Sequence, residues 1–179
     1  DPFTRHLFLH HPHTHVEDLI FVEHEPSGQV VSSLCLIPWT WSYGGVRIPA
    51  GEMGIVGTRE EYRHRGLIRA QVAFFNRRLR QRGCLLSHIQ GIPYYYRQFD
   101  YQYALPLEGG LRLELRHVPA PPDGSITFRP ATPEDAPVLS RLYDAAAADL
   151  ELHAVRDQAA WRYVLTRSAD TEMEREIWI

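Results

Sequence analysis

Three arginines crowd the start of an expected helix, where the positive end of the helix dipole disfavours cations. Residues 59–83 hold eight arginines against two glutamates, a net charge of +6 in a chain that totals −3. Four of these arginines lie near the helix end, where the dipole stabilises cations. Arg63, Arg65 and Arg69 lie at its start, beside a glycine loop that leaves backbone N–H groups free for an anion. The segment therefore indicates a phosphate or pyrophosphate site; a solvated basic turn is the alternative.

The elements that must position this turn follow from the hydrophobic pattern. Ile68, Val72, Phe75 and Leu79 recur at helical spacing, which predicts a helix with one buried stripe that ends before Gly83. The sequence around it predicts strands at 19–22, 30–41, 46–58, 84–89, 101–105 and 111–115, and a short helix at 94–99. Because glycines interrupt the third strand, we expect a bulge or the close approach of a ligand there.

The glycine-broken strand and the basic turn together resemble motif A of the GNAT superfamily of N-acetyltransferases, written Q/R-x-x-G-x-G/A. Arg63 and Gly66 match this pattern, whereas Ile68 stands where glycine or alanine is usual. The resemblance implies an α/β (α+β) fold, with a mixed, mostly antiparallel sheet flanked by helices, and acetyl-CoA as cosubstrate. The arginine-rich variant of the motif is similar to that of the Eis-like, tandem-GNAT branch, whose members acetylate amines that include aminoglycosides.

The same resemblance implies a role for each matching position. The residues that it implies for the cofactor are Val56, Gly57, Thr58, Arg63, His64, Arg65, Gly66, Leu67, Ile68, Arg69, Gly91 and Ile92. The turn at 63–69 would hold the pyrophosphate, and the backbone at 56–58 would meet the pantetheine and the thioester. Gly57 suits that role because it has no side chain. Gly91 and Ile92 would line the cofactor on its other side.

The segment from Tyr95 to Tyr101 resembles a second family pattern, F/Y-Y-x-x-F-G-F/Y. In the family, its second aromatic residue lies near the CoA sulfur and protonates the leaving thiolate, and that position is Tyr96 here. Asp100 replaces the usual glycine, so we expect the turn after this helix to differ. A packed aromatic helix face is the alternative interpretation of these tyrosines.

Two residues are candidates for the general base. Glu52 lies 11 positions before Arg63, where some members of the family carry a glutamate base, and strand alternation places it on the face of Gly54 and Val56. Partial burial would raise the pKa of its carboxyl toward the range that a base needs. An edge-strand glutamate in solvent is the alternative. His88 is the second candidate, although a lone buried histidine is more often structural.

These residues lead us to expect an enzyme that transfers acetyl from acetyl-CoA to a primary amine by direct attack, with Tyr96 as general acid. The acceptor would be a small molecule or a peptide amine, and Trp39 and Trp41 would either line its cleft or pack as ordinary strand residues. The alternative is a non-catalytic GNAT-like module that binds acyl-CoA or a partner protein. Self-association into a homo-oligomer is compatible with either function.

The chain divides into three expected segments. Residues 1–117 resemble a GNAT domain without its first strand and helices, 118–125 form a proline-rich linker, and 126–179 resemble the start of a second GNAT-like domain. In the last segment we expect a helix from Thr132 to about residue 149, a second helix at 157–167 and a strand from 176. These helices could instead complete the first domain. Because the chain opens at Asp1, we expect a piece of a longer protein.

Composition argues against several other classes. With 179 residues, 44% of them hydrophobic, the chain can bury a core. The net charge of −3 argues against nucleic-acid binding by charge alone. No apolar run approaches the ~20 residues of a membrane span. The two cysteines form no CxxC pair, which fits a reducing cytoplasm. The histidines at 10–15 lack a positioned fourth ligand, so we expect an exposed loop and no metal site there.

Overall fold

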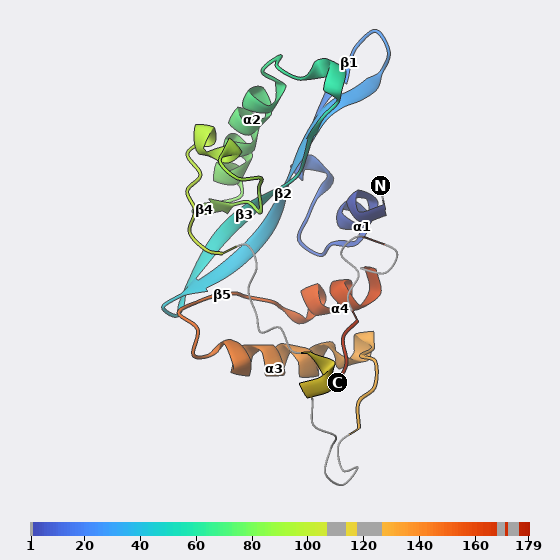
Figure 1. Cartoon of the computed structure of the whole chain (residues 1–179), viewed down its shortest axis with the longest axis vertical. Helices are drawn as coiled ribbons and strands as arrows, with labels where there is room; N and C mark the ends of the chain where they lie inside the picture. Colours follow the sequence, from blue (N-terminus) through green and yellow to red (C-terminus); the bar gives the residue numbers. More distant parts are fainter. Residues whose placement is uncertain (1, 107–113, 118–126, 168–170, 172–175) are drawn as a thin grey trace.

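The computed structural model describes residues 2–106, 114–117, 127–167, 171 and 176–179 (Figure 1). The predicted linker at 118–125 and residues 111–113 of the predicted strand at 111–115 lie outside these residues, and Leu115 begins a 3-10 helix rather than ending a strand. The strands are β1 (Leu19–His24), β2 (Gln29–Tyr43), β3 (Val46–Thr58), β4 (Leu86–His88) and β5 (Leu152–Ala154). The α-helices are α1 (Pro2–His10), α2 (Leu67–Gln81), α3 (Ala136–Ala147) and α4 (Gln158–Arg167). Short 3-10 helices lie at Val16–Asp18, Glu60–Tyr62, Tyr95–Phe99, Leu115–His117 and Pro133–Asp135.

The described strands form one mixed, mostly antiparallel sheet in the order β1-β2-β3-β4, with β5 paired to β2. β2 and β3 make a long hairpin whose turn holds Gly44 and Gly45 at φ of 53° and 80°, which L side chains rarely adopt. β1 and β5 pair with opposite ends of the same edge of β2. β4 is parallel to β3. The expected fold class, an α/β fold with helices around a mostly antiparallel sheet, is confirmed.

Helix α2 covers one face of the sheet with the predicted stripe. Val72, Phe75 and Leu79 are buried and belong to one apolar cluster with Leu34 and Leu36 of β2, and Ile68 packs against it. A side chain at Gly51 of β3 would collide with Leu79, so this glycine sets how closely α2 approaches the sheet. Gly83, with φ of 69°, follows the helix in the left-handed conformation of a C-terminal cap.

The opposite face of the sheet carries α1, which the sequence did not predict. Leu7 is buried against Cys35 and Ile37 of β2, and it is the one buried residue of this helix. A nine-residue helix with a single buried side chain has no apolar period, and the hydrophobic pattern therefore could not reveal it. Figure 1 shows α1 and α2 on the two sides of the β2–β3 hairpin.

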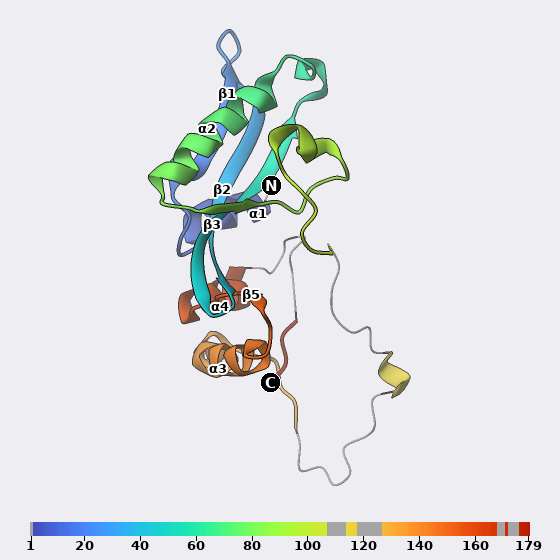
Figure 2. The same cartoon turned by 90° about the vertical axis from the view of Figure 1, so that its left-hand side faces the viewer.

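The C-terminal segment packs at the end of this sheet. β5 pairs with β2 through Trp41–Tyr43, and α3 and α4 lie side by side (Figure 2). The rings of Tyr143 and Trp161 form a contact between these two helices. Helix α3 begins as predicted, after a Thr132 capping box and a 3-10 turn, and α4 matches the predicted second helix. Residues 129–131 hydrogen-bond with 177–179. The division into domains at 118–125 stays a prediction.

Two predicted strands differ in the structure. The strand predicted at 84–89 is only β4, and Leu85 beside it is 80% exposed, because the chain meets the sheet at its edge rather than in its middle. Residues 101–105 form no strand. Within the described part of the chain, no helix is long and apolar enough to cross a membrane.

Candidate active site

A β-bulge in β3 decides which way its side chains point. Ser33 pairs with Gly57 but Cys35 pairs with Gly54, so β3 carries one residue more than β2 across this interval. The backbone turns at Ile55, whose φ is 53°. Glu52 lies opposite Ile37, on the face of α1, whereas Val56 packs against the α2 cluster. The prediction that Glu52 and Val56 share a face is therefore wrong, because the bulge reverses the alternation between them.

The outer edge of β3 is open beyond the bulge. β4 pairs only with residues 50–52, and no described strand pairs with that edge from Met53 to Thr58. Gly57 is exposed, and a Cβ built there would meet no atom within 4 Å. Unpaired backbone groups and free space therefore coincide at the predicted pantetheine segment, 56–58. An extended ligand can add to such an edge as a strand would.

The basic turn presents its backbone to solvent. Gly66 is the N-cap of α2 with φ of 75°, and His64 also has a positive φ of 61°. The N–H groups of the first helical residues, Leu67 to Arg69, cannot be bonded within the helix. The side chains of Arg63, His64, Arg65 and Arg69 are exposed. The turn thus combines free donors with positive charge, as the sequence predicted.

Two of these arginines are held by neighbours. The Arg65 guanidinium donates to the carbonyl of Glu61 at 2.9 Å and lies 4.9 Å above the Tyr62 ring. Arg69 donates to Gln98 at 3.3 Å and lies 5.6 Å from the centre of the Phe99 ring. Gln98 and Phe99 belong to the 3-10 helix that carries Tyr96, so Arg69 ties this helix to the start of α2.

Tyr96 lies against Gly91, where any side chain would collide with its ring. Burial raises the pKa of the Tyr96 phenol, and its hydroxyl has no hydrogen-bond partner among the described residues. Asp100, where the family has glycine, adopts φ of 67° and ψ of 14°. That is the left-handed conformation that glycine takes most readily and that Asp tolerates, so the expected change in this turn is accommodated without a glycine.

Glu52 lies on an interior strand in a polar and aromatic setting, not at a solvent-exposed edge. Its carboxylate accepts a 2.7 Å hydrogen bond from Trp39 Nε1 and lies 3.8 Å from His88 Nε2. Burial raises the pKa of Glu52, and the Trp39 bond opposes that shift only in part. Burial lowers the pKa of His88 to about 4, so this imidazole is neutral near pH 7. His88 also accepts a weak 3.4 Å bond from Trp41.

One cavity of about 1130 Å³ brings the two predicted catalytic residues together. Of the predicted site residues, those that line it are Glu52, Val56, Gly91, Ile92 and Tyr96. Gly57, Thr58 and the turn at 63–69 are not among the lining residues, so the basic turn lies apart from this cavity. The arrangement is a cavity with a carboxyl and a phenol, next to an open strand edge that leads to a basic helix start.

The structure adds lining residues that sequence reasoning missed. His11, Arg156, Asp157 and Tyr163 all line the cavity, and three of them come from the C-terminal segment. No motif marks Arg156, Asp157 or Tyr163, because the C-terminal segment reaches the site through tertiary contacts, namely the pairing of β5 with β2 and the contacts of Asp157 and Tyr163 with the histidine-rich segment. The backbone bond from Val155 N–H to the Thr40 carbonyl, 2.8 Å, continues that pairing to the cavity.

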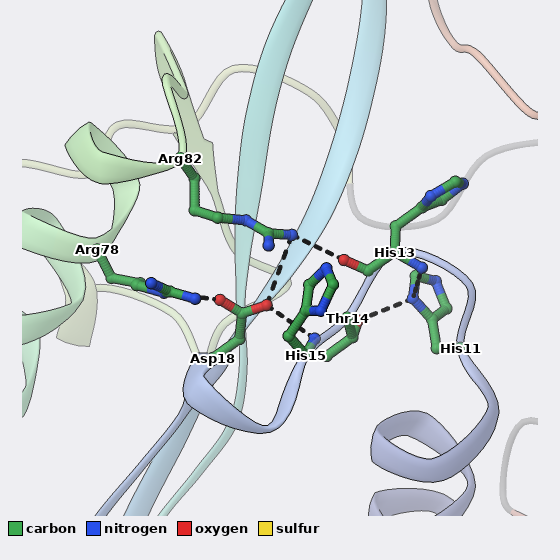
Figure 3. A network of polar contacts seen from close by, with 7 residues as sticks. All are labelled: His11, His13, Thr14, His15, Asp18, Arg78 and Arg82. Carbon is green, nitrogen blue, oxygen red and sulfur yellow. Dashed lines mark hydrogen bonds and ion pairs between the residues drawn. The ribbon is translucent and has the colours of Figure 1, made fainter.

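The histidine-rich segment lines the cavity through His11, His13 and His15, and Figure 3 shows the polar contacts that hold it. His13 Nε2 lies 2.9 Å from the Asp157 carboxylate, and the Thr14 hydroxyl bonds His11 Nδ1 at 2.8 Å. His11 packs edge-on against Tyr163, and burial lowers its pKa to about 4. The prediction of an exposed loop is confirmed for His13, whose side chain is exposed, and is wrong for His11, whose side chain is partly buried. Among the described residues, no group of three or more His, Cys, Asp and Glu side chains is arranged to hold a metal ion.

Behind this segment lies a buried ion-pair cluster. Asp18 is fully buried and pairs with Arg78 at 2.9 Å and with Arg82 at 3.5 Å (Figure 3). It also accepts the backbone N–H of His15, and Arg82 donates to the His13 carbonyl at 2.7 Å. The helix dipole alone would explain arginines at the end of α2. In the structure, Arg78 and Arg82 also anchor the histidine-rich segment to this helix.

Comparisons with known proteins agree with this fold. A family model described as an acetyltransferase (GNAT) domain matches residues 6–104. No curated protein matches the sequence. The fold is similar to that of Saccharomyces cerevisiae N-myristoyltransferase with bound myristoyl-CoA and inhibitors, with a TM-score of 0.65 and 14% identity over 99% of this chain and 46% of that one. It is also similar to Eis1 from Mycobacterium abscessus, with a TM-score of 0.58 and 18% identity over 90% of this chain and 41% of that one. The chain thus spans less than half the length of either structure.

Proposed function

The chain belongs to the GNAT acetyltransferase family, and on that premise we propose that it transfers an acyl group, acetyl in the first instance, from an acyl-CoA thioester to an amine. The observation that carries the proposal is the cavity that holds both Glu52 and Tyr96. The first is a carboxyl with a raised pKa, and the second is a phenol kept protonated at neutral pH. A base and an acid with separated pKa values are what a direct transfer requires.

The transfer proceeds by attack of the amine nitrogen on the thioester carbonyl carbon. The attacking nitrogen loses its proton to the Glu52 carboxylate, directly or through one water molecule. A backbone N–H on the open edge of β3 stabilises the tetrahedral oxyanion, because a donor fixed in advance costs no reorganisation during the reaction. The carbon–sulfur bond then breaks, and the Tyr96 hydroxyl gives its proton to the departing thiolate. The products are an amide and free CoA, and solvent restores both protonation states.

Glu52 is the base in this proposal and His88 is its neighbour. A base works best when its pKa lies near the working pH. The pKa of His88, about 4, is moved away from that range, whereas the pKa of Glu52 is moved toward it. The neutral His88 ring also contacts the rings of Trp39 and Trp41 edge-on, a packing role.

The basic turn supplies the cofactor-binding half. The pyrophosphate binds the backbone N–H groups and arginines of residues 63–69, and the pantetheine runs along Val56, Gly57 and Thr58 toward the cavity. Gly91 and Ile92 face it from the other side. Exposed positive charge, a left-handed N-cap and the open edge of β3 support this placement.

The Eis-like relationship and the domain organisation belong to the same proposal. Similarity in fold to Eis1 over 90% of this chain but only 41% of that one supports a chain that is part of a larger, tandem-GNAT protein. Residues 126–179 would then begin a second GNAT-like unit whose β5 strand also extends the first sheet.

The test is release of free thiol from acetyl-CoA when a panel of primary amines is added to the full chain. We expect turnover that Tyr96→Phe lowers about 10²- to 10⁴-fold, as for loss of a general acid, at unchanged acetyl-CoA affinity. Tyr95→Phe is the matched control, since Tyr95 is the adjacent tyrosine and does not line the cavity. Equal loss in both variants, or full activity in Tyr96→Phe, would contradict the proposal. Acetyl-CoA binding without any turnover would favour a binding module instead.

A further inference from the structure

Arg156 is a cation for which the described residues provide no anion. Its guanidinium carbon lies 5.5 Å from the ring centre of Trp161, 5.6 Å from that of Tyr143 and 5.9 Å from that of Trp39. The Nε–H is buried and has no hydrogen-bond partner, and no carboxylate of the described residues forms an ion pair with this side chain. The indole Nε1–H of Trp161, which touches it, is also buried and unpaired.

The three aromatic rings around Arg156 leave its guanidinium without hydrogen-bond acceptors in the described part of the chain. Aromatic faces attract the positive charge, but they do not replace hydrogen-bond acceptors at the edges of the guanidinium plane. Because the Nε–H is buried, a ligand in the cavity that Arg156 lines can reach only the terminal N–H groups, for which the described residues provide no acceptor. A carboxylate is the natural partner, because its two oxygens match the parallel N–H groups of arginine.

The position of Arg156 in the fold links its missing hydrogen-bond partner to the proposed reaction. Arg156 lines the same cavity as Glu52 and Tyr96. Trp39 connects Arg156 with Glu52, since its ring contacts the Arg156 guanidinium and its Nε1 donates a hydrogen bond to the Glu52 carboxylate. A small molecule that lies across Trp39 would therefore place one end at the base and the other end at the arginine.

The charge of the cavity also favours a ligand with a carboxylate. Arg82 shares the buried Asp18 carboxylate with Arg78, and Asp157 is paired with His13. The cations that remain without an acidic partner among the described residues are Arg47 and Arg156. With the Glu52 carboxylate counted against these two arginines, the described lining still has a surplus of positive charge, which disfavours a polycationic acceptor such as a polyamine or an aminoglycoside.

We propose that the acceptor is an amino acid, whose carboxylate binds the Arg156 guanidinium while its amine faces Glu52. This inference rests on the proposed function, and it names the substrate class of the same site. Arg156 is then a specificity-determining residue that touches the acceptor and takes no part in proton transfer.

Calorimetric titration of the full chain tests the inference without need of turnover. The probes are glycine, β-alanine and γ-aminobutyrate, each compared with the amine that lacks its carboxylate: methylamine, ethylamine and propylamine. We expect at least one amino acid to bind about 10- to 100-fold more tightly than its matched amine, the contribution of a charge-assisted pair. Arg156→Gln should abolish that difference, and Arg156→Lys should retain part of it. Arg141→Gln, an exposed arginine on α3 outside the cavity, is the control and should bind like the wild type.

Several results would overturn the inference: equal binding of amino acids and amines, no binding of any amino acid, tighter binding of spermidine, or unchanged affinity in Arg156→Gln. If Arg156→Gln fails to fold by circular dichroism, the wild-type comparison and Arg156→Lys decide. Thiol release separates this inference from the proposed function. Turnover of amines with no preference for a carboxylate overturns only the acceptor class. Arg156-dependent amino-acid binding without turnover supports the acceptor site and contradicts the transferase function.

Discussion

The Trp39 indole donates a 2.7 Å hydrogen bond to the Glu52 carboxylate across the β2–β3 hairpin. Trp39 pairs with Ala50 and Ile37 pairs with Glu52, so the two side chains lie two positions apart on one face of the sheet. The bond has two consequences. It fixes the orientation of the carboxyl toward the cavity, and it stabilises the charged form against the effect of burial.

Removing this donor is expected to shift the pH dependence of the reaction. In Trp39→Phe the pKa of Glu52 rises further, because burial then acts unopposed. Since the base must be ionised, the acidic limb of kcat/KM against pH should move to higher pH. Trp41→Phe is the matched control, because Trp41 bonds His88 rather than Glu52. An acidic limb that stays in place in Trp39→Phe would show that Glu52 is not the titrating base.

Asp18 is expected to be the most sensitive charged residue for stability. Asp18→Asn keeps its shape but leaves Arg78 and Arg82, both about one-fifth exposed, without their buried anion. Removing one partner of such a cluster should lower the free energy of unfolding by about 2–4 kcal/mol, somewhat less than for fully buried pairs. Asp149→Asn, at an exposed position after α3, should change it by less than about 0.5 kcal/mol. Urea unfolding of the three proteins measures the difference, and equal midpoints would refute the role of the cluster.

Substitutions at two glycines of β3 are expected to have different effects, one on stability and the other on acetyl-CoA binding. In Gly51→Ala the new methyl group collides with Leu79 in the core, so stability should fall by about 1–3 kcal/mol. In Gly57→Ala the methyl group enters open space on the unpaired edge, so stability should hold while acetyl-CoA binds more weakly. Thermal melting and calorimetry on both variants check this contrast. Unchanged acetyl-CoA affinity in Gly57→Ala would exclude this edge as the pantetheine path.

Two partly buried histidines are expected to weaken the fold in acid. His11 and His88 have pKa values of about 4 in the folded chain against an ordinary histidine value of 6.5, so the unfolded chain binds protons first. The stability that these groups contribute is complete above pH 6.5 and is lost as the pH falls from 6.5 toward about 4. The nearby Asp157 offsets only part of the effect at His11.

His11→Asn tests this dependence, because Asn can still accept the bond from Thr14 but does not titrate. The loss of unfolding free energy between pH 7 and pH 5 should be smaller in this variant than in the wild type. His117→Asn, at an exposed position, should behave like the wild type. The same acid dependence in all three proteins would contradict the assignment to His11.

The sequence predicted the elements with strong local signals. The apolar stripe and terminal Gly83 located α2, and Thr132 followed by Pro133 and two acidic residues located the start of the α3 segment. It also placed Glu52, Tyr96, Gly91 and Ile92, which the structure brings to one cavity. Those residues follow short patterns along the chain, and the fold preserves their order along β3 and after β4.

Features that depend on tertiary packing could not be predicted. The alternation of side chains along β3 gave the wrong face for Val56. A bulge at Ile55, and not at a glycine, reverses the face to which the later side chains point. Arg156 carries no motif, and its part in the cavity depends on the pairing of β5 with β2, more than 100 residues away along the chain. The burial of Asp18, and hence the role of Arg78, likewise appears only when α2 packs on the sheet.

The most direct test of the account is calorimetric titration of acetyl-CoA into the full chain and four variants. We predict micromolar binding that is lost in Arg65→Glu and in Gly66→Asp. It should persist in Gly66→Asn, which tolerates the left-handed N-cap without adding an anion, and in Arg77→Glu on the exposed side of α2. Equal binding by all five proteins, or none by the folded wild type, would contradict an acyl-CoA site at the start of α2.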